Sequence, residues 1–147
     1  MFTIALFLAS SINTLFAQKV EIEGDKVTLE SKEILKYEKI NLYQISFYSL
    51  ETGDEILLFK AFNNETPENT NDDYYILNFL KEKIKIETTD FSKIFVGFGL
   101  NAKKNMQKLI SWLVKEKVLA ADGKINREKL DVFYEKYNEN IRQRTIR

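Results

Sequence analysis

The sequence predicts an α+β fold in which an N-terminal antiparallel meandering sheet of about five to seven strands is packed by two C-terminal amphipathic helices. Residues 19–98 consist mostly of short alternating or β-branched runs separated by turn residues, which is typical of strands. From residue 101 onward, apolar side chains recur at steps of three and four residues, which is typical of helices. Strands first and helices last, without alternation, indicate an α+β rather than an α/β protein.

Residues 1–17 precede the first charged residue, Lys19, and have an apolar centre at Phe2–Leu8. A membrane-spanning helix needs roughly 20 apolar residues, so this stretch is too short to cross a bilayer. An apolar run followed by a polar stretch and an alanine is typical of a secretory signal peptide, although no Lys or Arg precedes the run. We expect cleavage after Ala17 and a single soluble α+β domain over residues 18–147. The alternative is a buried N-terminal strand or helix.

The first predicted strands form a hairpin with one solvated face. Residues 20–23 and 26–29 alternate between apolar and polar side chains, and Gly24-Asp25 between them supplies the turn. Residues 31–39 fit either a strand or a helix, so their conformation stays open at this point.

A second hairpin is expected from residues 40–50 and 55–62, with Thr52-Gly53-Asp54 as its turn. The first of these runs is rich in aromatic and β-branched side chains, and both of its faces are largely apolar. Strands that are apolar on both faces are usually central and covered on both sides. We therefore expect this hairpin to lie at the centre of the sheet between two covering layers.

The third part of the sheet follows the longest polar segment, residues 62–73, which holds the only proline and shows no periodicity. Residues 74–79 and 83–87 are expected to form another antiparallel pair. Residues 94–98 indicate a weaker strand that glycines interrupt. These segments complete a sheet in which every strand follows its neighbour along the chain.

Two helices are expected at the C-terminal end. Asn101 is a suitable N-cap for the first, which should end near residues 118–121 with Asp122-Gly123 as its stop. Asn126 should cap the second helix. The apolar stripe of the first helix consists of Ala102, Met106, Leu109, Ile110, Leu113 and Val114. The stripe of the second consists of Leu130, Phe133, Tyr134, Tyr137 and Ile141.

The composition excludes several kinds of active site. The chain contains no histidine, which removes Ser-His-Asp and Cys-His systems, histidine general bases and nearly every zinc site. It contains no cysteine, which removes thiol chemistry, iron–sulfur ligation, disulfides and a lipoprotein anchor. We therefore expect a protein that is not an enzyme, holds no cofactor and has no membrane anchor in its mature chain.

The charges are unevenly spread although their sum is zero. Residues 1–73 carry 13 acidic and 6 basic side chains, whereas residues 74–147 carry 9 acidic and 16 basic ones. The simplest interpretation is that the two halves attract each other within one fold, and a polar partner surface is the alternative. Lys, Asn, Ile, Glu and Tyr are common while Pro and Gly are scarce, which suits an AT-rich bacterial gene and a periplasmic or secreted destination.

Carboxylates leave one catalytic alternative open. A glycoside hydrolase needs only two Asp or Glu side chains, and Glu21 with Glu23 or Asp72 with Asp73 could supply such a pair. Acidic side chains on a solvated face are more common than catalytic ones, and no pattern here indicates a cleft with a raised pKa. A small carboxylate-dependent hydrolase acting on envelope polysaccharide is therefore the alternative function.

A calcium loop is matched only in part. Asn69, Asn71 and Asp73 have the alternate spacing of calcium ligands. However, Tyr74 stands where such a loop has its glycine, and Leu80 stands where it has its bidentate glutamate. We therefore predict no metal site, although the sequence leaves calcium binding by the acidic loop open.

The best partner site that the sequence offers is the polar segment 62–73 with the two tyrosines that follow it. The segment is too polar for the core and too long for a tight turn, and loops of this kind often carry function. Acidic groups around an aromatic ring can steer and then anchor a basic partner. The plain alternative is a hairpin connection without a role. The predicted partner-binding residues are Glu65, Glu68, Asp72, Asp73, Tyr74 and Tyr75.

Together these observations predict an exported, non-catalytic binding domain of the bacterial envelope. Its partner would be an envelope protein or a glycan. Nucleic acid is not expected as a partner, because an exported protein has no routine access to it.

Overall fold

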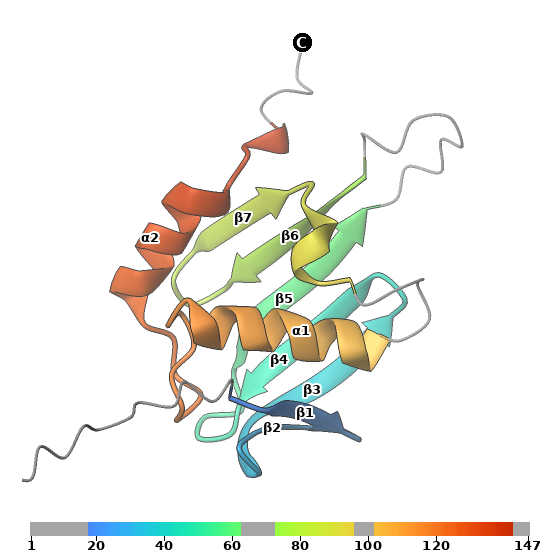
Figure 1. The fold of residues 1–147 in the computed structure, drawn as a ribbon, viewed down its shortest axis with the longest axis vertical. Helices are drawn as coiled ribbons and strands as arrows, with labels where there is room; N and C mark the ends of the chain where they lie inside the picture. Colours follow the sequence, from blue (N-terminus) through green and yellow to red (C-terminus); the bar gives the residue numbers. More distant parts are fainter. Residues whose placement is uncertain (1–17, 63–72, 96–101, 143–147) are drawn as a thin grey trace, which may run out of the picture.

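The computed structural model describes residues 18–62, 73–95 and 102–142. Seven strands form one antiparallel sheet in which each strand pairs with the next along the chain (Figure 1). This meander confirms the predicted fold class and the upper end of the predicted strand count. The strands are β1 Val20–Glu23, β2 Lys26–Leu29, β3 Lys32–Asn41, β4 Gln44–Ser49, β5 Glu55–Phe62, β6 Tyr74–Phe79 and β7 Ile84–Thr88.

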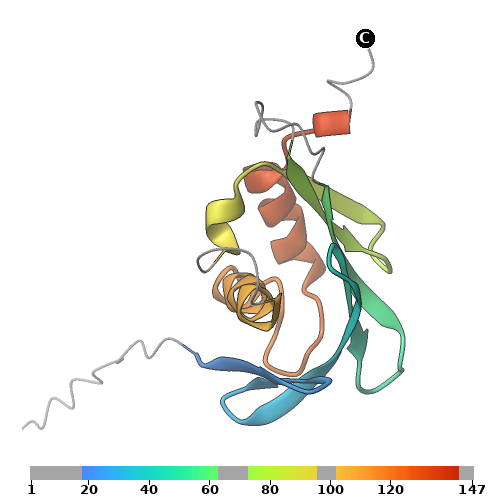
Figure 2. The ribbon, with the colours of Figure 1, turned by 90° about the vertical axis from the view of Figure 1, so that its right-hand side faces the viewer.

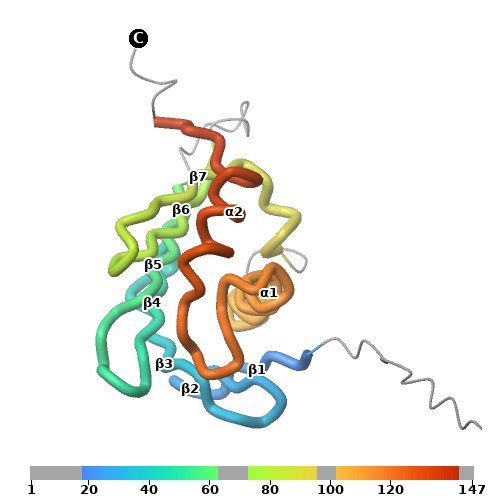
Figure 3. Tube along the Cα trace, turned by 90° about the vertical axis from the view of Figure 1, so that its left-hand side faces the viewer, coloured from blue at the N-terminus to red at the C-terminus, as the bar shows by residue number. Residues whose placement is uncertain are grey.

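The sheet is followed by the short 3-10 helix η2 Phe91–Lys93, then by α1 Ala102–Lys115 and α2 Arg127–Tyr137. Both α-helices lie on the same face of the sheet (Figure 2). Helix α1 packs against β1, at one edge of the sheet, and α2 packs against β7, at the other edge (Figure 3). The fold is therefore a layer of helices over one face of a curved sheet.

The expectation that the second hairpin is covered on both sides is wrong. Strand β3 extends to Asn41, and the chain turns there, with the Tyr43 amide donating to Asn41 Oδ1 at 2.8 Å. Leu42 and Tyr43 are consequently exposed, at 71% and 48% of their surface, and Leu50 lies in the next turn, also exposed. The apolar pattern continues through two turns, so it does not report a second buried face.

The apolar stripes of the helices are confirmed where they meet the sheet. Met106, Leu109, Ile110 and Leu113 of α1 are buried, as are Leu130 and Phe133 of α2. Trp112 joins the two helices, since its ring lies 4.7 Å from that of Phe133 and 4.8 Å from that of Tyr137. One apolar core therefore runs from β1 to α2 beneath both helices.

Helix α1 ends earlier than its apolar pattern predicts. Lys117 has a left-handed backbone, with φ at +61°. The amides of Val118 and Lys117 donate back to the carbonyls of Leu113 and Val114 at 2.9 and 3.0 Å. This is a Schellman motif, which ends a helix and satisfies its last carbonyls. Glycine usually occupies the left-handed position, so a lysine there gives no signal in the sequence.

The connection between the helices does contain the predicted stop. Gly123 has φ at +82°, and a Cβ at this position would lie 2.2 Å from the Ile34 carbonyl oxygen. Only glycine therefore fits where this loop crosses β3. The predicted cap of α2 is confirmed, because Asn126 accepts a hydrogen bond from the Lys129 amide at 3.1 Å.

The outcome differs between the two remaining segments predicted or considered as strands. The ambiguous residues 31–39 belong to β3, and the expected weak strand at 94–98 is not seen at Ile94 and Phe95, which follow η2. The predicted signal peptide and the predicted cap Asn101 lie outside the described residues. Among the residues that the structure describes, no helix has the length and apolar character needed to span a membrane.

Candidate functional site

Half of the predicted partner site lies outside the described residues. Glu65, Glu68 and Asp72 belong to the segment 63–72, of which nothing is described. Asp73 immediately precedes β6, and Tyr74 at the start of β6 pairs with Phe62 at the end of β5. The structure therefore places one acidic residue of the predicted site, Asp73, and both of its tyrosines.

Tyr74 takes part in a small aromatic surface. Its ring stacks on Phe62 with centroids 4.7 Å apart and planes inclined by 11°, and Lys60 Nζ lies 5.1 Å from the Phe62 centroid. Both rings are partly exposed. Such a stack can contact a partner, but the cation above it does not match the basic partner that the acidic loop was expected to attract.

Tyr75 points the other way and lies in the core. It has no exposed surface, and its hydroxyl donates to the Asp90 carbonyl at 3.0 Å. Burial raises the pKa of the Tyr75 phenol, and the nearby charges of Asp90 and Glu139 act in the same direction. Tyr75 therefore anchors β6 to the segment after β7, and it offers no surface to a partner.

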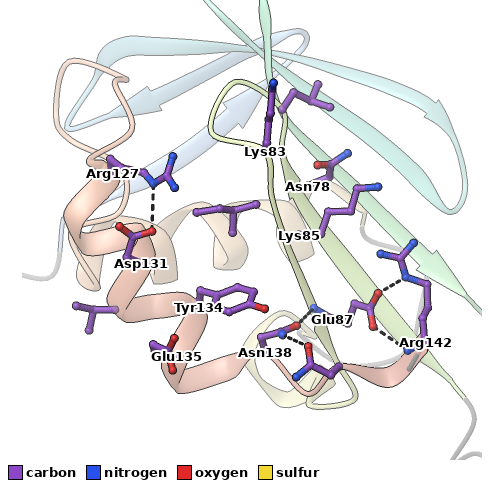
Figure 4. Close-up of a pocket in the computed structure, with 14 residues that line it drawn as sticks. Asn78, Lys83, Lys85, Glu87, Arg127, Asp131, Tyr134, Glu135, Asn138 and Arg142 are labelled. Atoms are coloured by element: carbon purple, nitrogen blue, oxygen red, sulfur yellow. Dashed lines mark hydrogen bonds and ion pairs between the residues drawn. The ribbon is translucent and has the colours of Figure 1, made fainter. Parts of the chain in front are cut away.

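A larger concave site lies at the opposite edge from β1, between α2 and β7 (Figure 4). Its volume is about 1270 Å³, which is larger than the roughly 300–1,000 Å³ of a typical small-molecule pocket. We call it the α2–β7 groove. Its lining includes Lys83, Ile84 and Lys85 on the β7 side and Val132, Tyr134 and Glu135 on the α2 side.

Helix α2 supplies one wall of the groove because only one of its faces is buried. Leu130 and Phe133 pack into the core and Tyr134 is partly buried against it, whereas Asp131, Val132 and Glu135 on the other side of the helix are exposed. Val132 keeps 48% of its surface exposed, and Tyr134 points from the helix toward β7 (Figure 4). The wall thus offers apolar surface beside charged side chains.

Strand β7 supplies the other wall and is an edge strand of the sheet. Its side chains alternate: Ile84 and Ile86 face the core, and Lys85 and Glu87 face the opposite side of the sheet. Both lysines of this wall, Lys83 and Lys85, are exposed. The groove therefore passes over the outer edge of β7 from the helical face to the open face.

The segment after α2 closes one end of the groove by binding the backbone of β7. Asn138 Oδ1 accepts from the Glu87 amide at 3.0 Å, and the Glu139 amide donates to the Glu87 carbonyl at 2.9 Å. A carboxylate oxygen of Glu139 also accepts from the Thr89 amide at 2.6 Å. We call these contacts the C-terminal clamp; they satisfy the edge of β7 only from Glu87 onward.

Two arginines hold two of the carboxylates that line the groove. Arg142 Nε pairs with Glu87, whose side chain is 6% exposed, and the Arg142 amide donates to the same carboxylate at 3.0 Å. Arg127 Nε pairs with Asp131 at 3.1 Å on the surface of α2. Burying Glu87 is tolerated because its charge is met by an opposite charge and by hydrogen bonds.

The described residues provide no metal centre. Across 18–62, 73–95 and 102–142, no three acidic, histidine or cysteine side chains converge closely enough to hold an ion. The partial calcium pattern at Asn69 and Asn71 lies outside those ranges. The chemistry that the groove can perform with its own residues is recognition through backbone groups, apolar surface and charge.

The sequence patterns did not indicate this groove, because its walls lie far apart along the chain. Glu87 and Arg142 are 55 positions apart, and nothing local in the sequence predicts that they meet. The alternation of residues 84–87 could have identified a strand with one wet face. It could not have shown that the strand is an edge with a helix beside it.

No protein-family model, curated protein or solved structure matches this chain, so the groove is interpreted from its own geometry.

Proposed function

We propose that this chain is an exported, non-catalytic binding domain of the bacterial envelope, and that its partner is an envelope protein held in the α2–β7 groove. The groove carries this proposal. It combines about 1270 Å³ of open volume with an edge strand on one side and a half-apolar helix on the other. Export rests on the signal-like residues 1–17 alone.

The lining of the groove resembles the usual anatomy of a protein interface. Val132 and Ile84 contribute apolar surface to the lining, and Lys83, Lys85 and Glu135 contribute exposed charged side chains. Interfaces commonly have an apolar centre and a polar rim, and the centre contributes most of the affinity. A glycan would more commonly be met by a row of exposed aromatic rings, and Tyr134 is the only aromatic side chain in this lining.

The carboxylate-dependent hydrolase is less well supported. Such an enzyme needs two carboxyl groups that can exchange protons or attack the substrate. Of the three carboxylates in the groove, Glu87 is held by Arg142 and Asp131 by Arg127. Only Glu135 lacks a basic partner among the described residues. The groove therefore favours binding over hydrolysis.

The proposal is tested by photo-crosslinking in the native host. A crosslinking residue at Val132 should capture one envelope protein, whereas the same residue at the exposed Leu42, away from the groove, should not. Mass spectrometry of this protein, isolated from the same cells, should show an N-terminus at Gln18. Equal capture at both positions would contradict the groove, and a cytoplasmic chain that keeps Met1 would contradict export.

A further inference from the structure

The hydrogen-bonding pattern of β7 shows which of its backbone groups face the groove. In an antiparallel pair, residues alternate between those bonded to the partner strand and those whose amide and carbonyl point away from it. Glu87 belongs to the second class, since its amide and carbonyl are bound by Asn138 and Glu139. Lys85 is two residues away in the same ladder, opposite Asn78, so its amide and carbonyl also point away from β6.

The C-terminal clamp stops short of Lys85. Glu139 pairs with Glu87 through its backbone amide, as a neighbouring strand would, and the Asn138 side chain takes the place of a backbone carbonyl. No described residue hydrogen-bonds to the outward amide or carbonyl of Lys85. Among the described residues, the edge of β7 is thus used for pairing at the Glu87 end and has no backbone partner at Lys85, where the groove lies.

We propose that the partner enters the α2–β7 groove as an extended segment that pairs with β7 at Lys85 and becomes an eighth strand of the sheet. This inference rests on the proposed function and names its mode of recognition. Addition of a strand to an exposed sheet edge is a common way to bind a peptide, because the backbone supplies affinity and the side chains supply specificity. Within the described chain the outward amide and carbonyl of Lys85 bind nothing, and such a strand requires an edge residue of this kind.

Charge selects the occupant. Lys83 and Lys85 are exposed on the strand, and neither forms an ion pair among the described residues. A second copy of this chain would bring its own lysines against them, and like charges on adjacent strands are destabilising. A segment of another protein with an acidic residue opposite Lys85 would be attracted instead.

The pleat of the sheet sets the side-chain pattern of that segment. A residue opposite Lys85 projects on the same face as Lys85, so an acidic side chain there meets the lysine. The residues before and after it project on the helical face, where Ile84, Val132 and Tyr134 lie. The expected sequence is therefore apolar, acidic, apolar, in extended conformation.

The proposal is tested with random short peptides displayed on phage and selected on the purified protein. Selected peptides should be enriched in the apolar, acidic, apolar pattern. Amide hydrogen exchange followed by NMR gives the decisive reading: a bound peptide should slow exchange at the Lys85 amide by about tenfold or more, because a strand would accept its hydrogen bond. Failure to select any binding peptide, or unchanged exchange at Lys85 in the bound state, would overturn the proposal.

Two substitutions at one position separate the backbone from the charge. Lys85→Pro removes the outward amide but no bond to β6, and proline is tolerated on edge strands whose amide faces outward. This variant should raise the dissociation constant of the selected peptide by about tenfold or more. Lys85→Ala keeps the amide and removes only the charge. It should lower the affinity for acidic peptides alone, and by a smaller factor than Lys85→Pro does. Equal binding by the proline variant and the original protein, with melting temperatures matched, would contradict strand pairing.

A third variant distinguishes this mode from the function that it rests on. Val132→Glu places a charge on the α2 wall without touching the β7 edge. If Val132→Glu abolishes peptide binding and Lys85→Pro does not affect it, the groove binds a partner in another way. Only the proposal of strand pairing with β7 would then be contradicted. If neither variant affects the peptide, the groove itself is not the site and both proposals fall.

Discussion

The two edges of the sheet are closed in different ways. At β1, helix α1 lies against the strand, Val20 and Ile22 are buried, and Gln107 Oε1 accepts the outward amide of Ile22 at 3.1 Å. At β7, the clamp from Asn138 and Glu139 reaches only one end of the strand. Helix α1 thus packs against β1 and supplies an acceptor for one of its outward amides, while among the described residues the clamp binds the edge of β7 only from Glu87 onward.

This difference shows how one sheet can avoid aggregation at one edge and keep the other edge usable. Unprotected edge strands pair with other chains, so proteins cover them, shorten them or place lysines on them. At β1, Gln107 of α1 already occupies the outward amide of Ile22. Lysines at β7 repel a copy of the same edge but leave the backbone of Lys85 accessible to an acidic strand. The sheet edge that is less protected within the described chain is thus the one to which we assign a function.

The largest change in stability is expected from a substitution in helix α1, which packs against the β1 edge. Leu113 is 1% exposed in the stripe with which α1 packs on the sheet. Leu113→Ala should lower the free energy of unfolding by about 2–5 kcal/mol, because it removes buried methyl groups and leaves a cavity. Denaturant unfolding measures this cost. Amide exchange at Ile22 should also quicken more than exchange at Glu87, since α1 covers β1 and not β7.

The control for this substitution is Lys104→Ala on the exposed side of the same helix, which should change stability by less than about 0.5 kcal/mol. Lys108 would be a poor control, because its Nζ donates to the carbonyls of Ser92 and Phe95 at 2.7 and 3.0 Å. Equal effects at Leu113 and Lys104 would show that α1 does not hold the β1 edge.

A smaller effect is expected from the ion pair at the clamped end of β7. Arg142→Ala leaves the buried carboxylate of Glu87 with fewer partners, which should cost about 1–2 kcal/mol, reduced because the arginine is half exposed. Arg127→Ala breaks an exposed pair on α2 and should cost less than about 1 kcal/mol. The two variants are compared by their denaturation midpoints. An equal cost for both would show that Glu87 is not a point of attachment for the C-terminal segment.

Most of the fold could be predicted because it rests on local periodicity. The alternation of β1 and β2, the stripes of both helices and the cap Asn126 are all signals within a few residues. Coverage of the sheet could not be predicted in the same way. Leu42 and Tyr43 continue the apolar run of β3 and β4, yet they sit in a turn, and local pattern does not separate these cases.

The candidate site was predicted less well, for a physical reason. A polar loop is visible in the sequence as composition, and that is what pointed to Asp73 and Tyr74. A groove depends on which strand lies at an edge and which helix lies beside it, and both follow from long-range packing. The contact between Glu87 and Asn138 spans 51 positions. Such contacts have no local signature.

At each edge one side chain accepts a hydrogen bond from an outward strand amide, and we expect these two hydrogen bonds to contribute similarly to stability. Gln107→Met removes the acceptor for the Ile22 amide while keeping the volume of the side chain, and Asn138→Ala removes the acceptor for the Glu87 amide. Each should cost about 0.5–1.5 kcal/mol, the usual net value of one hydrogen bond. Amide exchange should quicken only at the uncapped residue in each variant. Quickening at both residues in either variant would mean that the edges open together.

The smallest expected effect is at Lys85. Its side chain is exposed and forms no ion pair among the described residues, and its outward amide and carbonyl bind nothing in the described chain. Lys85→Ala should therefore change the free energy of unfolding by less than about 0.5 kcal/mol, whereas Asn138→Ala on the same edge should exceed that value. Denaturant unfolding of the two variants under the same conditions makes the comparison. A cost at Lys85 as large as at Asn138 would show that the open half of the edge contributes to folding, and the contrast between a stabilising and an unpaired half of β7 would be lost.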